Sequence, residues 1–261
     1  MPFEYINVSE HEHIYTIELA RPEVLNAINQ EMHDELQQAF DDFAANDNMY
    51  LAVVRGAGGR AFSAGSDLKA IAKAGKPNTY PKSGYAGLIE RYDLTKPIIA
   101  AVDGVAVGGG FEVALACDIL IATTRSRFGL PEPKIGAIAL GGGVHRLARQ
   151  IGLKKAMGLI LSANIIDAAE GDRLGFITEL VEPEQLDACV QKWCESILAC
   201  APLAIRASKE TVMRGLDEPS LEVAMQAQQD YPSFKAFYSS QDRHEGALAF
   251  AEKRPPNWQG K

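Results

Sequence analysis

The chain lacks long apolar runs and is poor in cysteine, with four cysteines among 261 residues. No uninterrupted apolar stretch approaches the roughly 20 residues that a membrane-spanning helix requires. The segment Met1–His13 carries three glutamates and no apolar stretch, so we do not expect a signal peptide there. By default, these features predict a cytoplasmic protein that does not associate with membranes.

The four cysteines, Cys117, Cys189, Cys194 and Cys200, show no CxxC spacing. Three of them follow one another at intervals of 5 and 6 residues in a stretch with helical periodicity. Such spacing suits packing better than a metal site or a disulfide framework. We therefore expect no bound metal.

Positive charge is also scarce, because 26 lysines and arginines face 34 acidic residues and leave a net charge of −8. This balance disfavours nucleic-acid binding, whose affinity depends mainly on phosphate contacts. It still permits an anionic small molecule to bind a few local cations. The 47% hydrophobic content is sufficient for one large domain with a buried core.

Strand and helix patterns alternate through the first part of the chain, which predicts an α/β core with parallel pairing. Phe3–Val8 and Ile14–Leu19 have the period-2 pattern of strands, joined by a turn at Ser9–His13. Asn29 is a suitable N-cap for the helix that follows. The Lys-, Gly- and Pro-rich segment 73–87 is expected to form a mobile surface loop.

Continuous apolar runs predict buried strands at Leu51–Val54, Ile98–Val102 and Ile119–Ala122. Phe111–Cys117 is predicted to be helical, and Arg127–Pro133 an irregular turn.

The strand signal ends near Pro183, and three helical segments follow. Pro202 stands where the first turn of a helix tolerates proline. We therefore divide the chain into an α/β core at 1–183 and a helical C-terminal region at 184–261.

Three short segments are candidates for a functional site. In Val107–Glu112, a buried strand enters three glycines that open a helix, where backbone N–H groups at the positive end of the helix dipole could bind an anion. The segment lacks the ending of a phosphate-binding P-loop and the spacing of a dinucleotide fingerprint. Taken alone, it is better explained as a tight packing turn.

The second segment, Phe62–Leu68, contains small residues that permit close backbone approach to a ligand. Taken alone, it is better explained as an ordinary strand-to-helix connection in which Ser66 or Asp67 caps the helix. In the third segment, Phe128–Pro133, Glu132 lies between two prolines that restrict the chain, although a rigid turn is the commoner explanation.

Together and in this order, the three segments resemble the signature of the crotonase (enoyl-CoA hydratase/isomerase) superfamily. The resemblance covers essentially the whole chain, and Gly110–Glu112, Gly142–Val144 and Tyr231–Ser233 are most similar to bacterial hydratases of the carnitinyl-CoA dehydratase (crotonobetainyl-CoA hydratase) kind. It implies a crotonase-type ββα spiral core within the α/β class. It also implies a C-terminal helical trimerisation region, in a homotrimer or a homohexamer built as a dimer of trimers.

The resemblance further implies catalytic roles. In the family, two backbone N–H groups form an oxyanion hole for the thioester carbonyl, and the matching positions are Ala64 and Gly109. Family hydratases use two glutamates around one water, matched here by Glu112 for water activation and Glu132 for proton delivery to the α-carbon. Two carboxylates that share one water have pKa values that differ.

An acyl-CoA substrate is implied as well. Lys253 would suit its 3′-phosphate as a point charge, although packing and solvation explain Phe234 and Lys253 equally well. Leu140 departs from the small or acidic residue that family hydratases usually have there, and its bulk would narrow the acyl pocket. The implied substrate-binding residues are Val24, Leu25, Ala27, Ser66, Asp67, Leu68, Gly108, Pro131, Leu140, Phe234 and Lys253.

Because both glutamates are present, the resemblance implies reversible hydration of the 2,3 double bond of an enoyl-CoA. Coenzyme A is part of the substrate, and no separate cofactor is implied. The nearest alternative is a dehydratase of a polar or branched acyl-CoA, such as a carnitinyl thioester. A double-bond isomerase comes third, since isomerases commonly lose the Glu112 position. Binding of AU-rich RNA, as by one relative, is disfavoured by the net charge of −8.

Overall fold

The computed structural model describes residues 3–75 and 78–261. The chain forms two compact units, one of Met1–Arg91 and Ile98–Lys192, the other of Tyr92–Pro97 and Trp193–Lys261. Within the described ranges, no helix is both long and apolar enough to span a bilayer.

The first unit contains a six-stranded sheet in the order β1-β2-β3-β5-β7-β10. Its strands are β1 (Ile6–His11), β2 (Ile14–Leu19), β3 (Leu51–Gly56), β5 (Ile98–Val102), β7 (Ile119–Thr123) and β10 (Glu179–Val181). β1 and β2 form an antiparallel hairpin, and the other neighbours are parallel. The predicted turn at Ser9–His13 is wrong in extent: β1 continues to His11, and Glu12 takes a positive φ of 53° in a tighter turn.

A four-stranded sheet, in the order β4-β6-β8-β9, completes the strands of this unit. It consists of β4 (Ala61–Ser63), β6 (Val105–Val107), β8 (Arg127–Gly129) and β9 (Ile165–Asp167). β4, β6 and β8 are parallel, and β9 is antiparallel to β8. The prediction of an irregular turn over Arg127–Pro133 is wrong for its first half, which forms β8. The strand was missed because three residues are too few to show a strand period. The parallel pairing places the carboxyl ends of β4, β6 and β8 side by side.

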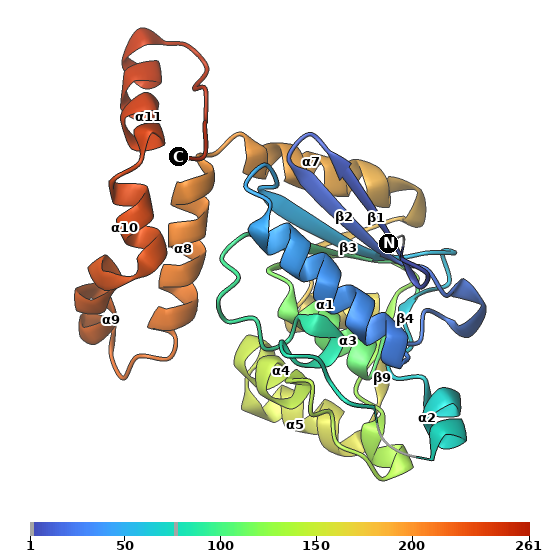
Figure 1. Cartoon of the computed structure of the whole chain (residues 1–261). Coiled ribbons are helices and arrows are strands. Elements are labelled where there is room, and N and C mark those ends of the chain that lie inside the picture. The colour runs from blue at the N-terminus through green and yellow to red at the C-terminus, as the bar shows by residue number, and fades with distance from the viewer. Residues whose placement is uncertain (1–2, 76–77) are drawn as a thin grey trace. The chain divides into compact units, whose positions relative to one another are not determined.

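Six α-helices belong wholly to the first unit as described: α1 (Gln30–Ala45), α2 (Leu68–Ala74), α3 (Gly109–Ala116), α4 (Gly143–Ile151), α5 (Leu153–Ser162) and α6 (Ala168–Leu174). Asn29 caps α1 as predicted, accepting the Met32 N–H at 3.0 Å. The helix contacts β1 and runs diagonally below β3 in the view of Figure 1. Its buried face includes Leu36, Phe40 and Phe43, each worth about 1.5–3 kcal/mol of transfer free energy.

The prediction that segment 73–87 forms a mobile surface loop is partly wrong. Its start completes α2, and its end forms a buried 3₁₀ turn, η2 (Tyr85–Gly87). Residues 76 and 77 lie outside the described residues. The apolar residues around η2, including Leu88 and Ile89, bury this part of the segment.

The second unit is helical, with α8 (Pro202–Gly215), α9 (Leu221–Ala227), α10 (Pro232–Tyr238) and α11 (Gln241–Glu252), while α7 (Leu186–Leu198) crosses the boundary between the units. Pro202 is the first residue of α8, as predicted. Buried Glu210 links α8 to α10 by accepting the Ser233 N–H at 2.7 Å. Residues 92–97 join this unit, since Lys209 Nζ donates to the Lys96 carbonyl at 2.9 Å.

Candidate active site

The three candidate segments follow the carboxyl ends of β4, β6 and β8 and meet there. The N–H of Gly108 donates to the Gly129 carbonyl at 2.9 Å, which joins the first segment to the third. The first and second segments touch, because a Cβ at Gly65 would lie 2.8 Å from the Gly109 nitrogen. Glycine is required at this contact for steric reasons.

Glu112 lies in the first turn of α3 and is 3% exposed. Its Oε1 accepts the N–H of Gly143 at 2.8 Å. A Cβ at Gly141 would overlap Oε2, and one at Gly143 would lie 2.9 Å from Cγ. Two glycines at the start of α4 therefore leave the volume that this carboxyl group occupies.

The environment of Glu112 favours its protonated form. Burial raises its pKa from 4.5 to about 7, and the negative charge of Glu132 acts in the same direction. The Gly143 N–H and the charge of Arg146 oppose this rise without cancelling it. A carboxyl group with a pKa near neutrality is suited to general acid–base chemistry.

Glu132 begins the 3₁₀ turn η3 (Glu132–Ile135), directly after Pro131. It is half-buried, and burial raises its pKa. Its Oε1 lies over the glycine turn, since a Cβ at Gly108 would be 3.1 Å away. Its Oε2 is buried and has no hydrogen-bond partner among residues 3–75 and 78–261. A water or a substrate atom could therefore bind to this oxygen.

The backbone of the second segment, Phe62–Leu68, corrects one prediction. The N–H of Ala64 donates to the Leu25 carbonyl at 2.9 Å. This hydrogen bond contradicts the prediction that Ala64 supplies an oxyanion donor, because its N–H is already engaged.

Ser66 is the better donor in this turn. The N–H groups of its neighbours Gly65 and Asp67 bind Ser63 Oγ and the Ile28 carbonyl. The Ser66 N–H makes no hydrogen bond within the described part of the chain. Gly109, the first residue of α3, has an N–H without an intrahelical acceptor. Two adjacent turns thus offer one free backbone donor each.

Residues 9–261 match the family model described as enoyl-CoA hydratase/isomerase. The chain belongs to this family.

Similarity to individual proteins extends over the full length. The carnitinyl-CoA dehydratase of Escherichia coli strain K12 is 36% identical over 264 residues, covering 99% of each chain. That of Proteus mirabilis is 36% identical, covering 95% of each chain. An enoyl-CoA hydratase structure from Mycobacterium tuberculosis H37Rv superimposes with a TM-score of 0.91 at 35% identity, covering 98% of this chain and 99% of the other. These matches confirm the predicted α/β crotonase-type fold.

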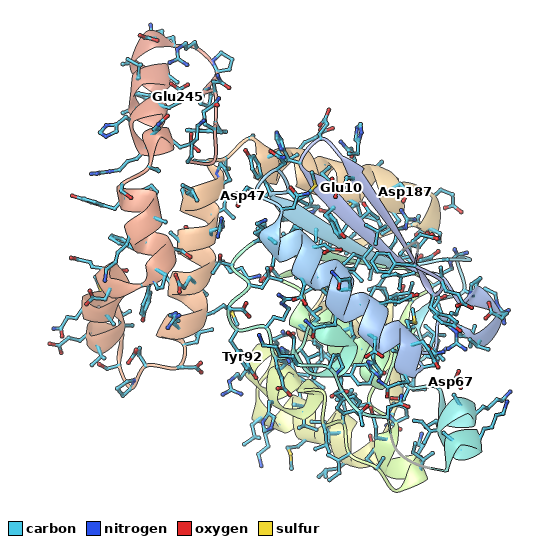
Figure 2. The ribbon with its side chains drawn as sticks, in the orientation of Figure 1. Glu10, Asp47, Asp67, Tyr92, Asp187 and Glu245 are labelled. Carbon is cyan, nitrogen blue, oxygen red and sulfur yellow. The ribbon has the colours of Figure 1, made fainter. Side chains whose placement is uncertain are left out.

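Asp67, a predicted substrate-binding residue of this family member, is engaged within the protein. Its carboxylate caps α2 through the Ala70 N–H at 3.0 Å and pairs with Arg21 at 3.0 Å. Figure 2 labels Asp67 beside α2. Burial alone would raise the pKa of Asp67, but these hydrogen bonds outweigh it and hold the pKa below its usual value. Asp67 therefore fixes the turn after β4 rather than offering a free carboxylate.

The segment Val24–Ala27 runs beside the same turn. Buried Asn26, at a positive φ of 53°, donates to the Ala57 and Ala61 carbonyls. Seven of the predicted substrate-binding positions lie in the same unit as the two glutamates. They are Val24, Leu25, Ala27, Ser66, Leu68, Gly108 and Pro131.

The remaining predicted positions differ in their surroundings. Leu140 is 75% exposed in the loop before α4. Phe234 lies in α10 and Lys253 caps the end of α11, so both belong to the second unit. The structure does not bring these two together with the glutamates within one unit.

Sequence reasoning missed Tyr85, the first residue of η2. Its hydroxyl lies 3.2 Å from Ser66 Oγ, and its ring packs on Gly109. The available signal was the apolar character of Ala86, Leu88 and Ile89, which is atypical of a mobile loop.

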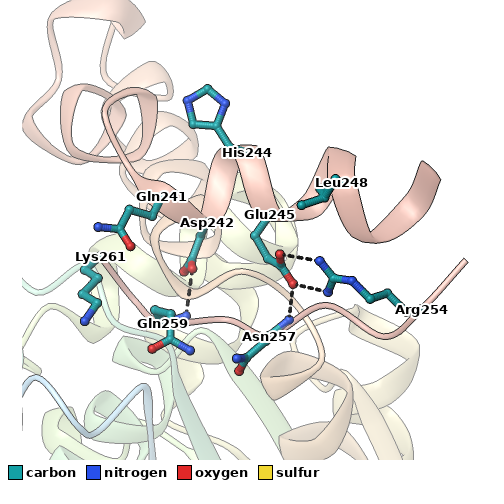
Figure 3. Close-up of a pocket in the computed structure, with 9 residues that line it drawn as sticks. All are labelled: Gln241, Asp242, His244, Glu245, Leu248, Arg254, Asn257, Gln259 and Lys261. Carbon is teal, nitrogen blue, oxygen red and sulfur yellow. Dashed lines mark hydrogen bonds and ion pairs between the residues drawn. The ribbon is translucent and has the colours of Figure 1, made fainter. Parts of the chain in front are cut away.

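The second unit has an open hollow where the C-terminal residues fold back along α11 (Figure 3). Its two carboxylates are already engaged: Asp242 accepts the Gln259 and Gly260 N–H groups, and Glu245 binds Arg254 through both oxygens. The hollow is therefore best explained by the packing of the C-terminal residues against α11, which these hydrogen bonds hold in place. Across the described residues, no cluster of three His, Cys, Asp or Glu side chains could hold a metal.

Proposed function

We propose that the protein is an enoyl-CoA hydratase, a hydro-lyase that adds water reversibly across the 2,3 double bond of an enoyl-CoA thioester. The main support is one arrangement: two carboxyl groups with raised pKa values, Glu112 and Glu132, beside two free backbone donors. Membership of the family makes a CoA thioester the expected substrate class.

The N–H groups of Ser66 and Gly109 would bind the thioester oxygen. Addition of water to C3 moves the π electrons of the double bond toward this oxygen, which becomes enolate-like. One preorganised donor of this kind is typically worth about 2.7–4 kcal/mol of barrier. The positive end of the α3 dipole acts in the same direction.

The two glutamates would divide the proton transfers. Ionised Glu112 takes a proton from water as the oxygen bonds to C3, and protonated Glu132 delivers a proton to C2. Water is thereby added across the double bond, and the proton of the pair has moved from Glu132 to Glu112. Exchange between the carboxyl groups through solvent restores the starting state.

This chemistry needs no separate cofactor. Hydration produces no net oxidation or reduction of the acyl group, so the proposal requires no redox partner. Coenzyme A enters and leaves as part of the substrate.

A carnitinyl-CoA dehydratase is the second candidate. Its support is the 36% identity over 99% of the chain to the E. coli protein of that name. The same pair, run in reverse, would return a proton from Glu112 to the leaving hydroxyl and remove the C2 proton with Glu132. An isomerase has less support, because moving a double bond does not require two carboxylates that share a water.

We also propose a homotrimer or homohexamer formed through the helical region. More than half of the surface of several apolar side chains there is exposed, and large exposed apolar patches mark interaction surfaces. These are Val212, Met213, Leu216, Leu221, Met225 and Phe250. In such an assembly, Phe234 and Lys253 would serve the coenzyme A of a neighbouring subunit. A cytoplasmic location stays a prediction.

The test is hydration of crotonyl-CoA, followed by loss of the enoyl-thioester absorbance. Glu132→Gln should lower kcat at least 100-fold, while the circular dichroism spectrum stays unchanged. The exposed Glu184 provides a matched control, Glu184→Gln, which should retain the full rate.

Four results would refute or redirect the proposal. Absence of hydration with a panel of enoyl-CoA substrates, or full activity in Glu132→Gln, would refute it. A higher kcat/KM for carnitinyl-CoA than for the hydration substrates would favour the dehydratase. Turnover of a 3-enoyl-CoA retained in Glu112→Ala would favour the isomerase.

A further inference from the structure

Tyr85 is a buried tyrosine that the mechanism above does not use. It is 2% exposed, and its hydroxyl lies 3.2 Å from Ser66 Oγ. Its phenol also packs against Gly109, where an added Cβ would overlap both the ring and the hydroxyl. One side chain therefore contacts both residues whose N–H groups are proposed to bind the thioester oxygen.

The turn that contains Tyr85 is fixed to α1 by its backbone. Gln37 accepts the Ser83 N–H at 2.9 Å. Gly87 lies directly on the backbone of Gln37, where a Cβ at Gly87 would overlap it. One turn earlier on α1, His33 Nδ1 accepts the Ala86 N–H at 3.0 Å.

His33 also fixes the ring of Tyr85. The two rings meet edge to face, with centroids 4.6 Å apart and planes at 83°. Burial lowers the pKa of His33 to about 4, so the ring is neutral at physiological pH and Nδ1 can accept a hydrogen bond. Buried His33 therefore holds both the backbone and the ring of this turn.

The backbone beside Tyr85 is strained. Ala86 adopts a φ of 54°, a left-handed conformation that residues other than glycine rarely take. Strain of this kind persists where the surrounding contacts over-determine the conformation, as the bonds to His33 and Gln37 do here. The contacts that impose the strain also direct Tyr85 toward Ser66 and Gly109.

We propose that Tyr85 is a positioning residue: its phenol fixes the turns of Ser66 and Gly109 so that their N–H groups converge on the thioester oxygen. This inference rests on the proposed function. Burial raises the pKa of Tyr85, so its hydroxyl stays protonated, and either hydroxyl can donate in the hydrogen bond between Tyr85 and Ser66.

Tyr85→Phe removes the hydroxyl and keeps the ring. Loss of one hydrogen bond that aligns the donors should lower kcat about 3- to 10-fold. KM should change little, because the oxyanion contact strengthens mainly in the transition state. The matched control is Tyr15→Phe, since Tyr15 is also 2% exposed but lies in β2 and packs on Phe43. This control should keep the wild-type kcat.

Carbonyl polarisation provides a readout that a merely structural role would not change. A cinnamoyl-CoA with a dimethylamino group on its ring absorbs at longer wavelength when hydrogen bonds polarise its carbonyl. Binding to the wild-type enzyme should shift this band to the red. The shift should be smaller for Tyr85→Phe and unchanged for Tyr15→Phe.

Ser66→Ala breaks the same hydrogen bond from its other end and keeps the backbone N–H. If Tyr85 acts through Ser66, the double variant should lose no more activity than the more affected single variant. Should Tyr85→Phe fail to fold, Ser66→Ala alone decides the matter through its kcat and its band shift.

The inference is overturned if Tyr85→Phe matches Tyr15→Phe in kcat and band shift, whatever its melting temperature, or if the losses from Tyr85→Phe and Ser66→Ala multiply. Failure of the proposed function looks different. In that case the wild-type enzyme itself hydrates no enoyl-CoA, whatever band shift it gives.

Discussion

Replacing Glu112 with glutamine should stabilise the protein at alkaline pH while abolishing hydration. The carboxyl group is 3% exposed, and burial raises its pKa from 4.5 to about 7. A carboxyl group with a higher pKa in the native state than in the unfolded state disfavours folding once the unfolded chain ionises. Wild-type stability should therefore fall as pH rises from about 4.5 through 7, and level off above that.

The magnitude follows from the two pKa values. Each pKa unit corresponds to about 1.4 kcal/mol, so a rise from 4.5 to about 7 costs roughly 3 kcal/mol when the group is fully ionised. At pH 5 most of this cost is absent, and at pH 8 nearly all of it is present. Glutamine stays neutral and keeps an oxygen for the Gly143 N–H. Glu112→Gln should thus gain about 2–3 kcal/mol relative to wild type between pH 5 and pH 8.

Urea unfolding at both pH values and one fixed protein concentration measures this gain. The control is Glu31→Gln, at an exposed glutamate in the first turn of α1, which should not reproduce the gain. A stability difference between Glu112→Gln and wild type that is equal at pH 5 and pH 8 would refute the argument. So would a Glu112→Gln protein that is less stable than wild type at pH 8.

Two further predictions concern the rate and the fold. Because hydration needs Glu112 ionised and Glu132 protonated, kcat/KM should follow a bell-shaped pH profile, rising as Glu112 ionises and falling as Glu132 loses its proton; a flat profile between pH 5.5 and pH 8 would contradict these roles. Asn26→Ala should cost about 3 kcal/mol in urea unfolding, since it leaves the Arg21 N–H and the Ala57 and Ala61 carbonyls without their buried partner. Asn48→Ala, at an exposed asparagine, is the control, and a loss of less than 1 kcal/mol for Asn26→Ala would contradict the argument.

Long, periodic elements could be predicted from the sequence. The spacing of Met32, Leu36, Phe40 and Phe43 predicted α1, and the cap at Asn29 is confirmed. Ile98–Val102 is a strand with the predicted bounds, and Pro202 begins α8 as expected. In these elements, burial on one face or on all sides leaves a pattern over many residues.

Short elements and backbone hydrogen bonds could not be predicted. β8 has three residues and no readable period. The choice between Ala64 and Ser66 as donor depends on which N–H the Leu25 carbonyl accepts, and that contact joins segments far apart in sequence. The segment with Tyr85 was misjudged because its lysines, glycines and prolines outweighed the apolar residues that bury its second half. In each case the deciding contact is tertiary, so composition alone does not reveal it.

The site also contains three features that destabilise the folded protein. A buried carboxyl group at Glu112, a buried Glu132 oxygen without a partner among the described residues, and a left-handed alanine at position 86 each raise the free energy of the native state. All three lie in the first unit, around the carboxyl ends of three short parallel strands or on the turn that contacts them. The long hydrophobic face of α1 offsets these costs and also fixes the strained turn through His33 and Gln37. Stability and catalysis are therefore coupled through this helix: a substitution that loosens its contact with the turn should lower kcat before it unfolds the protein.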